Sequence, residues 1–280
     1  MMGDMVPKPR SLILDLFGEY LRFADARVRL AHLTSLLGDF DVSPATVRVT
    51  MSRLRREGWF TTQRDSRETI YQLSDVMLEV LREGRARIFS PAPGDWNGEW
   101  TMVIYQLSED ERQEREQLRK QLSWHGFGSL TTSTWLAPGD RKDTASSLVA
   151  ALPAGRADVL TCRTKGPEHD LDLTERCWDL IGLAQEYRTF IEDHEYLVDK
   201  AATLEGAEAL VARTLLIFRY RHFPFRDPML PTTLQPEAWP GNEAHQLFRS
   251  VHAELGPASR AHVSQVVGRP VDDPETSPLP

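Results

Sequence analysis

Six arginines crowd into residues 43–67, a window that holds only two acidic residues, Glu57 and Asp65. It is the most basic window of its length in the chain. Arginine binds nucleic-acid phosphates through its charge and the edges of guanine bases through paired hydrogen bonds. The window is therefore a candidate nucleic-acid contact. Its arginines are Arg48, Arg53, Arg55, Arg56, Arg64 and Arg67.

The first four of these arginines fall on a predicted helix with a clear start. Ser43 is a good N-cap, and Pro44 suits the first helical position. Val47, Met51 and Leu54 recur at the spacing of a buried stripe. Four residues lie off that stripe, and we expect them to face outward: Thr46, Arg48, Thr50 and Arg53. Each of the two arginines among them could pair with a guanine edge.

A β-hairpin is predicted directly after this helix. Two β-prone runs, 59–63 and 69–73, flank a polar turn at 64–67. Arg64 and Arg67 would lie at the tip and reach phosphates or the minor groove.

A solvated cationic helix is the alternative interpretation of the arginine-rich helix, since arginines also favour a helix C-terminus. The remaining predicted DNA contacts are Ser43, Arg55, Arg56 and Tyr71.

The residues before this window predict two more helices. Leu12, Leu16, Tyr20 and Phe23 recur at helical spacing, and the leucines of 30–37 fit a short helix. Helix, helix, helix and hairpin, followed by a helix over about 74–88, is the order of a winged helix-turn-helix. With this frame around the arginines, DNA binding is the favoured interpretation.

The next part of the chain predicts a second kind of fold. A proline-rich linker covers 90–95. Strands are expected at 100–105, 126–130, 133–136 and 157–163, with helices at about 109–124 and 143–152. The order βαββαβ is typical of a ferredoxin-like domain.

Helical patterns dominate from about residue 170 onward. One apolar stripe runs from Leu173 through Ile181 to Ile191, and later helices fit 205–222 and 242–255. Five prolines between 224 and 240 exclude a helix there. The tail after Val267 is expected to be disordered. The predicted fold class is α+β, with a winged helix at 1–90, a ferredoxin-like domain at 91–168 and a helical domain at 169–280.

A second set of residues has the chemistry of a ligand site. The rings of Trp96 and Trp100 could enclose an aryl group, although such residues more often anchor a linker against a core. A cationic run beside the proline-rich loop could bind phosphates, although cations at a helix end are ordinary. This run consists of Arg219, Arg221, His222 and Arg226.

Composition excludes several classes of protein. The chain has 280 residues and a net charge of −8. Residues 1–90 hold 14 Lys and Arg against 12 Asp and Glu, which leaves −10 on the rest. The basic window is thus local, and not part of a uniformly basic coat. No membrane span or signal peptide is readable, and the spacing of Cys162 and Cys177 argues against a zinc finger and favours a reducing cytoplasm.

Several blocks of the sequence resemble the PaaX family of bacterial repressors. SLILDLFGEY (11–20), VRVTMSRL (47–54) and EGWF (57–60) are similar to its opening helix, its recognition helix and the strand that follows. Further matches are WNGEW (96–100), WHGFG (124–128), WLAP (135–138), YRHFPFRDP (220–228) and WPG (239–241). The chain departs from the family in the wing, where RETIY (67–71) with Glu68 replaces a segment usually richer in arginine and aromatics. It also departs at Asp25-Ala26-Arg27, where a Gly-Gly pair is usual.

This resemblance implies a dimeric, cytoplasmic transcriptional repressor that binds double-stranded operator DNA. It also implies a Cas2-like central domain and a helical C-terminal domain. The implied effector, which releases the DNA, is an aryl-acyl-CoA such as phenylacetyl-CoA. We expect no catalysis, no resident cofactor or metal, and no membrane association.

Two alternatives remain open. Cas2 nucleases place a metal-binding Asp after the first strand of this domain, where the chain has Gln106. A neutral amide is a poor magnesium ligand, and the acids at 109–111 fit a first helical turn. The other alternative is a winged-helix module that binds protein, against which the arginine face argues.

Overall fold

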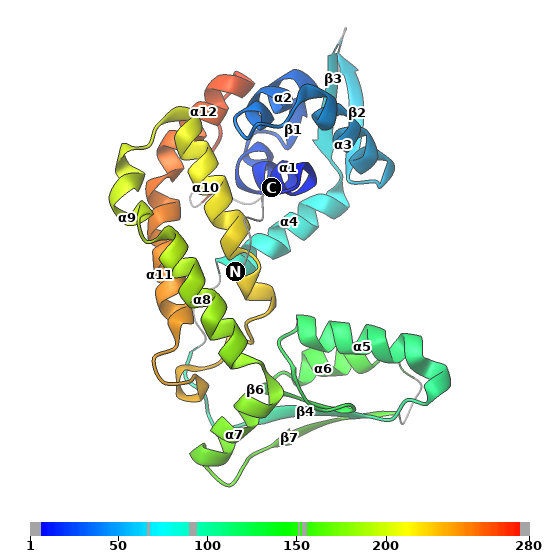
Figure 1. The fold of residues 1–280 in the computed structure, drawn as a ribbon. Coiled ribbons are helices and arrows are strands. Elements are labelled where there is room, and N and C mark those ends of the chain that lie inside the picture. Colours follow the sequence, from blue (N-terminus) through cyan, green and yellow to red (C-terminus); the bar gives the residue numbers. More distant parts are fainter. Residues whose placement is uncertain (1–6, 66–67, 90–93, 151, 153–155, 275–280) are drawn as a thin grey trace. The chain divides into compact units, whose positions relative to one another are not determined.

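The computed structural model describes residues 7–65, 68–89, 94–150, 152 and 156–274. They fold into helices and two antiparallel sheets (Figure 1). The chain forms two compact units. Unit 1 comprises Met1–Phe89, Phe190–Arg221 and His245–Pro280, and unit 2 comprises Ser90–Thr189 and His222–Ala244. Within the described ranges, no helix has both the length and the apolar character to cross a bilayer.

Unit 1 begins with the elements that the sequence predicted around the arginines. The predicted helices and hairpin are confirmed, although Arg64 and Asp65 extend the first hairpin strand instead of lying in the turn. The elements are α1 (Pro9–Glu19), η1 (Leu21–Phe23), α2 (Leu30–Gly38), α3 (Pro44–Arg56), β2 (Phe60–Asp65), β3 (Glu68–Leu73) and α4 (Asp75–Ile88).

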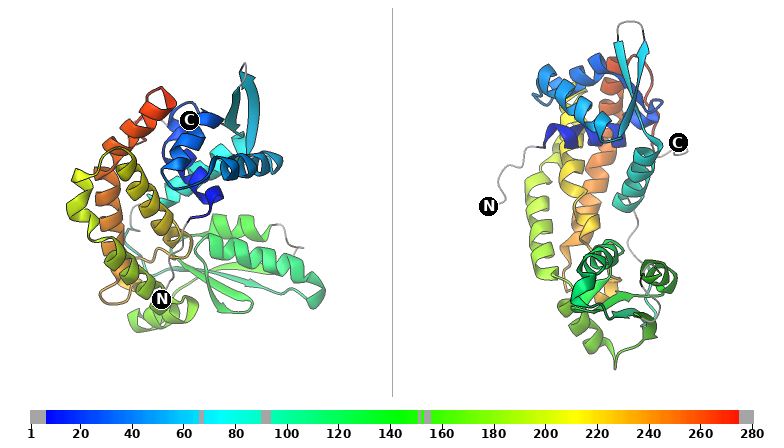
Figure 2. Two further views of the ribbon diagram at one scale, coloured as in Figure 1. Left: turned by 45° about the horizontal axis from the view of Figure 1, so that its top comes forward. Right: turned by 90° about the vertical axis from the view of Figure 1, so that its right-hand side faces the viewer.

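A short strand that the sequence analysis missed completes the first sheet. β1 (Arg27–Arg29) pairs antiparallel with β3, so that the strand order is β1-β3-β2. Three residues are too few to show a period-2 pattern, and β1 is extended because β3 supplies its partner. β2 and β3 form a ribbon that extends away from the helices of unit 1 (Figure 2).

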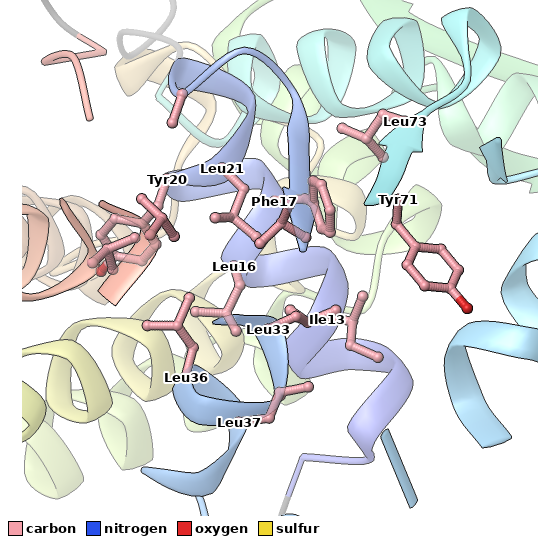
Figure 3. Close-up of a cluster of buried hydrophobic side chains, with 14 of the residues drawn as sticks. Ile13, Leu16, Phe17, Tyr20, Leu21, Leu33, Leu36, Leu37, Tyr71 and Leu73 are labelled. Atoms are coloured by element: carbon pink, nitrogen blue, oxygen red, sulfur yellow. The ribbon is translucent and has the colours of Figure 1, made fainter. Parts of the chain in front are cut away.

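One hydrophobic core joins α1, α2, α3 and the sheet (Figure 3). Ile13, Leu16 and Phe17 of α1 are completely buried, and Phe17 contacts Phe60 with ring centroids 4.8 Å apart. Leu210 and Val263 from the C-terminal part of the chain belong to the same core. The first helix is therefore packed from both sides.

Helices from the C-terminal part supply that second side. α10 (Gly206–Tyr220) packs on α1, and α12 (Gly256–Val267) packs on α10 and α2. The predicted third domain is thus divided, because these helices join unit 1 while others join unit 2. The remaining elements wholly within this part of unit 1 are α9 (Leu197–Lys200) and η3 (Ala201–Thr203).

The expectation of a disordered tail after Val267 is wrong for residues 268–274. Val271 is buried in the core of unit 1, and the Asp272 N–H donates to the carbonyl of Phe23. Arg260 pairs with Asp273 at 2.7 Å. Composition suggested disorder, but one apolar side chain and these polar contacts hold the segment.

Unit 2 contains the predicted βαββαβ pattern. Its sheet has the order β5-β6-β4-β7, in which every neighbouring pair is antiparallel. α5 and α6 cover one face (Figures 1 and 2). The elements are β4 (Trp100–Tyr105), η2 (Glu109–Glu111), α5 (Arg112–Trp124), β5 (Gly128–Thr131), β6 (Thr134–Pro138), α6 (Lys142–Val149) and β7 (Ala157–Cys162).

The other face of this sheet carries a second, aromatic-rich cluster. Trp100 and Leu136 of the sheet pack there with Cys177 of α7 and with residues of the proline-rich loop. The elements here are α7 (Pro167–Cys177), η4 (Phe223–Phe225) and η5 (Thr232–Leu234). α8 (Leu180–His194) and α11 (Pro240–Glu254) begin in this unit and end in unit 1.

The single apolar stripe predicted from Leu173 to Ile191 is wrong in one respect. Trp178 is extended, with φ −134° and ψ 147°, and separates α7 from α8. After this break the helical phase is reset, so that Ile181 is 86% exposed.

Candidate nucleic-acid interface

α3 presents the exposed cationic face that the sequence predicted. The Ser43 hydroxyl caps the helix by accepting a hydrogen bond from the Thr46 N–H at 3.2 Å. Val47, Met51 and Leu54 fix the opposite face in the core. Ser43 is therefore a structural cap whose hydroxyl is also within 2.9 Å of the Thr46 hydroxyl.

Most of the arginines on this face are free to bind a ligand. The side chains of Arg48, Arg55 and Arg56 are exposed and have no hydrogen bond or ion pair to any described residue. The core stripe turns them toward solvent, and no carboxylate neutralises them. A helix with this face can place charged donors against an anionic polymer.

Arg53 differs, because it is already paired. Its Nε lies 3.0 Å from Glu57, which also accepts a hydrogen bond from Arg10 at 2.6 Å. The hydrogen bond from Arg53, more than that from Arg10, lowers the pKa of Glu57. Arg53 must exchange this partner to contact DNA. Thr50 is similarly engaged, since its hydroxyl donates to the Thr46 carbonyl.

The structure adds one residue that the sequence analysis missed. Val49 is 70% exposed on α3, and it shares a face with Arg53 and Arg56 at intervals of four and three residues. An exposed apolar side chain on such a face can contact the methyl group of thymine. The signal was available in the sequence, because Val49 lies off the buried stripe.

The hairpin carries Arg64 on an exposed strand position opposite Thr69. No described residue pairs with Arg64. Arg67 lies outside the described residues. Near the turn end of the hairpin, Arg29 is paired with Glu68 at 2.8 Å and with Asp65 at 3.3 Å.

Tyr71 does not belong to this surface. Its side chain is only 7% exposed, and its ring packs edge-on against Phe60 with centroids 6.3 Å apart (Figure 3). β3 alternates its faces, and this position faces the core. The predicted DNA contact at Tyr71 is therefore a core contact.

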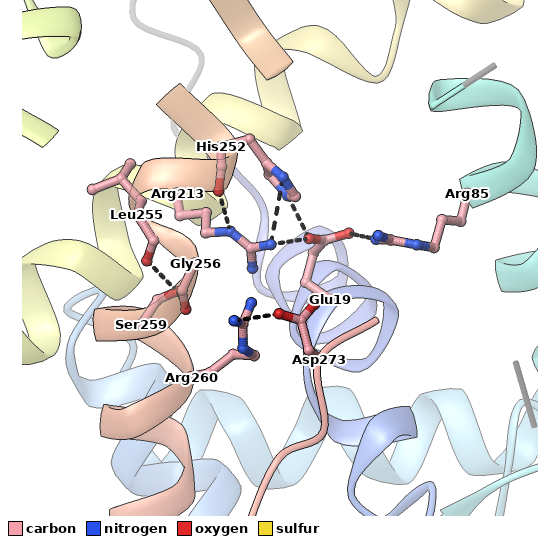
Figure 4. A network of polar contacts seen from close by, with 9 residues as sticks. All are labelled: Glu19, Arg85, Arg213, His252, Leu255, Gly256, Ser259, Arg260 and Asp273. Carbon is pink, nitrogen blue, oxygen red and sulfur yellow. Dashed lines mark hydrogen bonds and ion pairs between the residues drawn. The ribbon is translucent and has the colours of Figure 1, made fainter. Parts of the chain in front are cut away.

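A buried polar cluster fixes the end of α1 within unit 1 (Figure 4). Glu19 is contacted by Arg85 of α4 at 3.1 Å, by Arg213 of α10 at 3.3 Å and by His252 of α11 at 2.6 Å. Burial alone would raise the pKa of Glu19, but His252, Arg213 and Arg85 together hold it well below its usual value. Glu19 is thus ionised and joins three elements to α1.

His252 completes this cluster as a neutral group. Burial, followed by the charge of Arg213, lowers its pKa to about 4. The neutral ring fits the geometry, with Nε2–H donating to Glu19 and Nδ1 facing Arg213 at 3.4 Å. No sequence pattern indicated this site, because its residues are distant in the chain.

The tryptophans predicted as a ligand site form a packed core. Trp96 and Trp100 meet edge to face at 5.3 Å, and Trp100 is completely buried. Their indole N–H groups donate to the Glu99 carbonyl and to Asp170 at 2.7 and 2.8 Å. In this arrangement they anchor the start of β4.

The predicted cationic run is divided between the two units. Arg221 is paired with Asp15 at 3.2 Å, and Arg226 with Glu186. His222 is exposed, and Arg219 lines a pocket of about 580 Å³ in unit 1. The four do not form a single phosphate site within either unit.

Comparison with known proteins places this fold in a family. Models of that family match three successive segments: "PaaX-like protein" at residues 8–77, "PaaX protein central Cas2-like domain" at 93–174 and "PaaX-like protein C-terminal domain" at 178–265. The chain is also 31% identical over 266 residues to the transcriptional repressor PaaX of Escherichia coli, covering 91% of this chain and 83% of the relative. The chain belongs to the PaaX-like family.

A solved structure is similar to this PaaX-like chain over most of its length. The uncharacterized protein Rv0674 from Mycobacterium tuberculosis matches with a TM-score of 0.58 and 26% identity. The match covers 84% of this chain and 89% of that one. The resemblance to the family seen in the sequence blocks is confirmed, and so is the Cas2-like central domain.

Proposed function

We propose that this chain is a transcriptional repressor that binds operator DNA as a homodimer and leaves it when an aryl-acyl-CoA such as phenylacetyl-CoA binds. In this proposal, α1–α3, β1–β3 and α4 form a winged helix-turn-helix. α3 is the recognition helix, and the β2–β3 ribbon is the wing. The Escherichia coli relative, which is named a transcriptional repressor, supports the class of function.

The exposed face of α3 carries the proposal. Its free arginines can bind phosphates or guanine edges, and Val49 can contact thymine, so one helix holds both kinds of base-reading group. A second recognition helix in a dimer would read the other half of a palindromic site. The buried stripe holds the opposite side of α3 in the core and leaves this face exposed.

Genomic binding-site mapping, followed by titration of the purified protein with the sites found, tests this function. We expect a specific inverted repeat that binds two chains, and release of DNA by phenylacetyl-CoA but not by free CoA. Absence of any specific site would overturn the repressor proposal. A specific site from which no aryl-acyl-CoA releases the protein would overturn only the part of the proposal that concerns the effector.

The first variant for this titration is Arg48→Ala. We expect it to weaken specific binding at least tenfold, since a good base contact contributes about 1–3 kcal/mol. Arg176→Ala on α7 is the matched control, because that arginine is paired with Asp172 in unit 2. Unchanged binding by Arg48→Ala in a gel-shift titration would remove Arg48 from the base-reading set.

Arg64→Ala tests the wing in a different way. We expect binding to weaken about equally on specific and random DNA, and the salt slope to fall by about one charge. The measurement is fluorescence anisotropy over a series of salt concentrations. A loss confined to one sequence would show that Arg64 reads bases and not phosphates.

A further inference from the structure

The central unit has a cationic pocket of about 650 Å³ at the end of β4. Gln106 follows β4 and lines this pocket together with the Thr132–Ser133 turn. The Tyr105 hydroxyl donates to the Thr132 carbonyl at 2.8 Å and fixes that turn against the strand end. The pocket is distinct from the α3 surface, since every lining residue belongs to unit 2.

Arginines from two elements meet at this pocket. Arg115 and Arg119 lie on successive turns of α5, and Arg156 immediately precedes β7. A spacing of four residues places the first two on the same face of the helix. The lining residues include one carboxylate, Glu109, against these three guanidinium groups, and so carry a net positive charge. Glu116 and Glu111, the partners of Arg119 and Arg156, lie outside the lining.

The carboxylates near these arginines hold them loosely. The ion pairs of Arg115, Arg119 and Arg156 have N–O distances of 3.6, 3.4 and 3.6 Å. A charge-assisted hydrogen bond is typically about 2.8 Å long. Glu109, the partner of Arg115, is 91% exposed. The guanidinium N–H groups can therefore turn to a better anion with little loss.

Glu111, the partner of Arg156, is held more closely by the start of α5 than by that arginine. Glu111 accepts from the backbone N–H and the hydroxyl of Ser108, at 2.8 and 2.9 Å. These hydrogen bonds lower the pKa of Glu111 and fix its charge at the helix start. Gln106 brings an amide, whose N–H₂ group donates to an anion, whereas a carboxylate at this position would repel one.

We propose that this pocket binds the diphosphate of a small nucleotide-like molecule. Arginine forks match phosphate oxygens in pairs, and the three guanidinium groups outnumber the one carboxylate of the lining. The volume lies within the range of small-molecule sites and favours a compact ligand over a DNA backbone. The identity of the physiological ligand rests on the proposed function, in which the effector is an acyl-CoA. An acyl-CoA carries a diphosphate of this kind.

Calorimetric titration of the full chain with ADP tests the site, with pantetheine as the probe that lacks phosphate. We expect ADP to bind and pantetheine not to bind. Arg115→Ala, Arg119→Ala and Gln106→Glu should each weaken ADP binding at least tenfold. Arg112→Ala is the matched control, since Arg112 is exposed on α5 but does not line the pocket, and its effect should stay below twofold.

Operator binding in the absence of nucleotide, measured on the same variants, separates this site from the repressor function. We expect operator binding to be unchanged in all four variants. Failure of the wild-type chain to bind ADP would overturn the pocket while leaving DNA binding intact. Equal losses in Arg112→Ala and Arg115→Ala would also overturn it, by showing general charge attraction. Loss of DNA binding instead of ADP binding would assign the arginines to nucleic acid.

Discussion

At the scale of single residues, the environment of a side chain decides its role. Arg48 and Arg53 lie on the same helix, yet one is free and the other is paired with Glu57. Trp100 and Tyr71 have the chemistry of binding residues, but burial makes them core residues. The sequence predicts which residues have suitable chemistry. It does not show which of them tertiary packing leaves exposed.

Asp15 shows how burial changes a charged residue of α1. Burial raises the pKa of its carboxyl to about 7, against the opposing charge of Arg221. One carboxyl oxygen has no hydrogen-bond partner in the described structure. The unfolded chain releases this proton near its ordinary value, so Asp15 costs stability increasingly as the pH rises from about 4 to 7.

We predict that Asp15→Asn removes this cost. The free energy of unfolding of the variant minus that of the wild type should rise across this window by on the order of 1 kcal/mol per pH unit. His252 contributes a trend of opposite sign in both proteins, because its lowered pKa favours folding above its ordinary value. Subtracting the wild type removes that trend.

Urea unfolding at several pH values between 4 and 8 measures the difference. Asp172→Asn, at an exposed position of α7, is the control substitution. A difference that stays constant with pH would show that Asp15 is ionised in the folded protein throughout this range.

At the scale of elements, the sequence predicted those features of helices and strands that depend on interactions between residues close together in the chain. Ser43 and Pro44 start α3 as expected, because capping is decided within one helical turn. β1 and α12 were missed for the opposite reason. β1 needs β3 as a partner, and α12 buries small residues such as Gly256 and Ser259, which give little amphipathic signal. Trp178 ends α7 without a glycine or proline to announce it.

The turn between α2 and α3 contains a strained residue. Asp41 has φ +59°, in the left-handed region that costs a residue with a side chain about 1–2 kcal/mol. We predict that Asp41→Gly raises the free energy of unfolding by about 1 kcal/mol. Thermal unfolding followed by circular dichroism measures this change as a higher Tm.

Asp39, in the same turn, provides the contrast. It has an ordinary φ of −64° and contacts His262 at 2.8 Å. Asp39→Gly should lower Tm, because it relieves no strain and loses this contact. If both glycine variants shift Tm in the same direction, the backbone of the turn is not the cause.

At the scale of the whole molecule, unit 1 is assembled from three separate segments of the chain. The net charge of −8 hides a basic helix face, and the order of predicted domains likewise hides this assembly. No sequence pattern showed that α10 and α12 cover α1 and α2, because such contacts join residues roughly 200 positions apart. Domain boundaries along a chain therefore do not fix the units in space.

We predict that a fragment of residues 1–89 is much less stable than the full chain. It lacks Leu210 and Val263, and it leaves Glu19 without Arg213 and His252. Removing one partner of a buried charge typically costs about 3–5 kcal/mol. The fragment should lack a cooperative thermal transition by circular dichroism. A sharp transition at the temperature of the full chain would contradict the shared core.

The cluster at Glu19 also sets the order of events during synthesis. Arg85 emerges from the ribosome soon after Glu19, but Arg213 and His252 emerge much later. Domains usually fold as they emerge, N-terminal first. Here the segment that carries α3 remains without these supporting contacts until α10 and α11 have been synthesised. A product of translation that stops before α10 would thus expose an incomplete first segment to proteases.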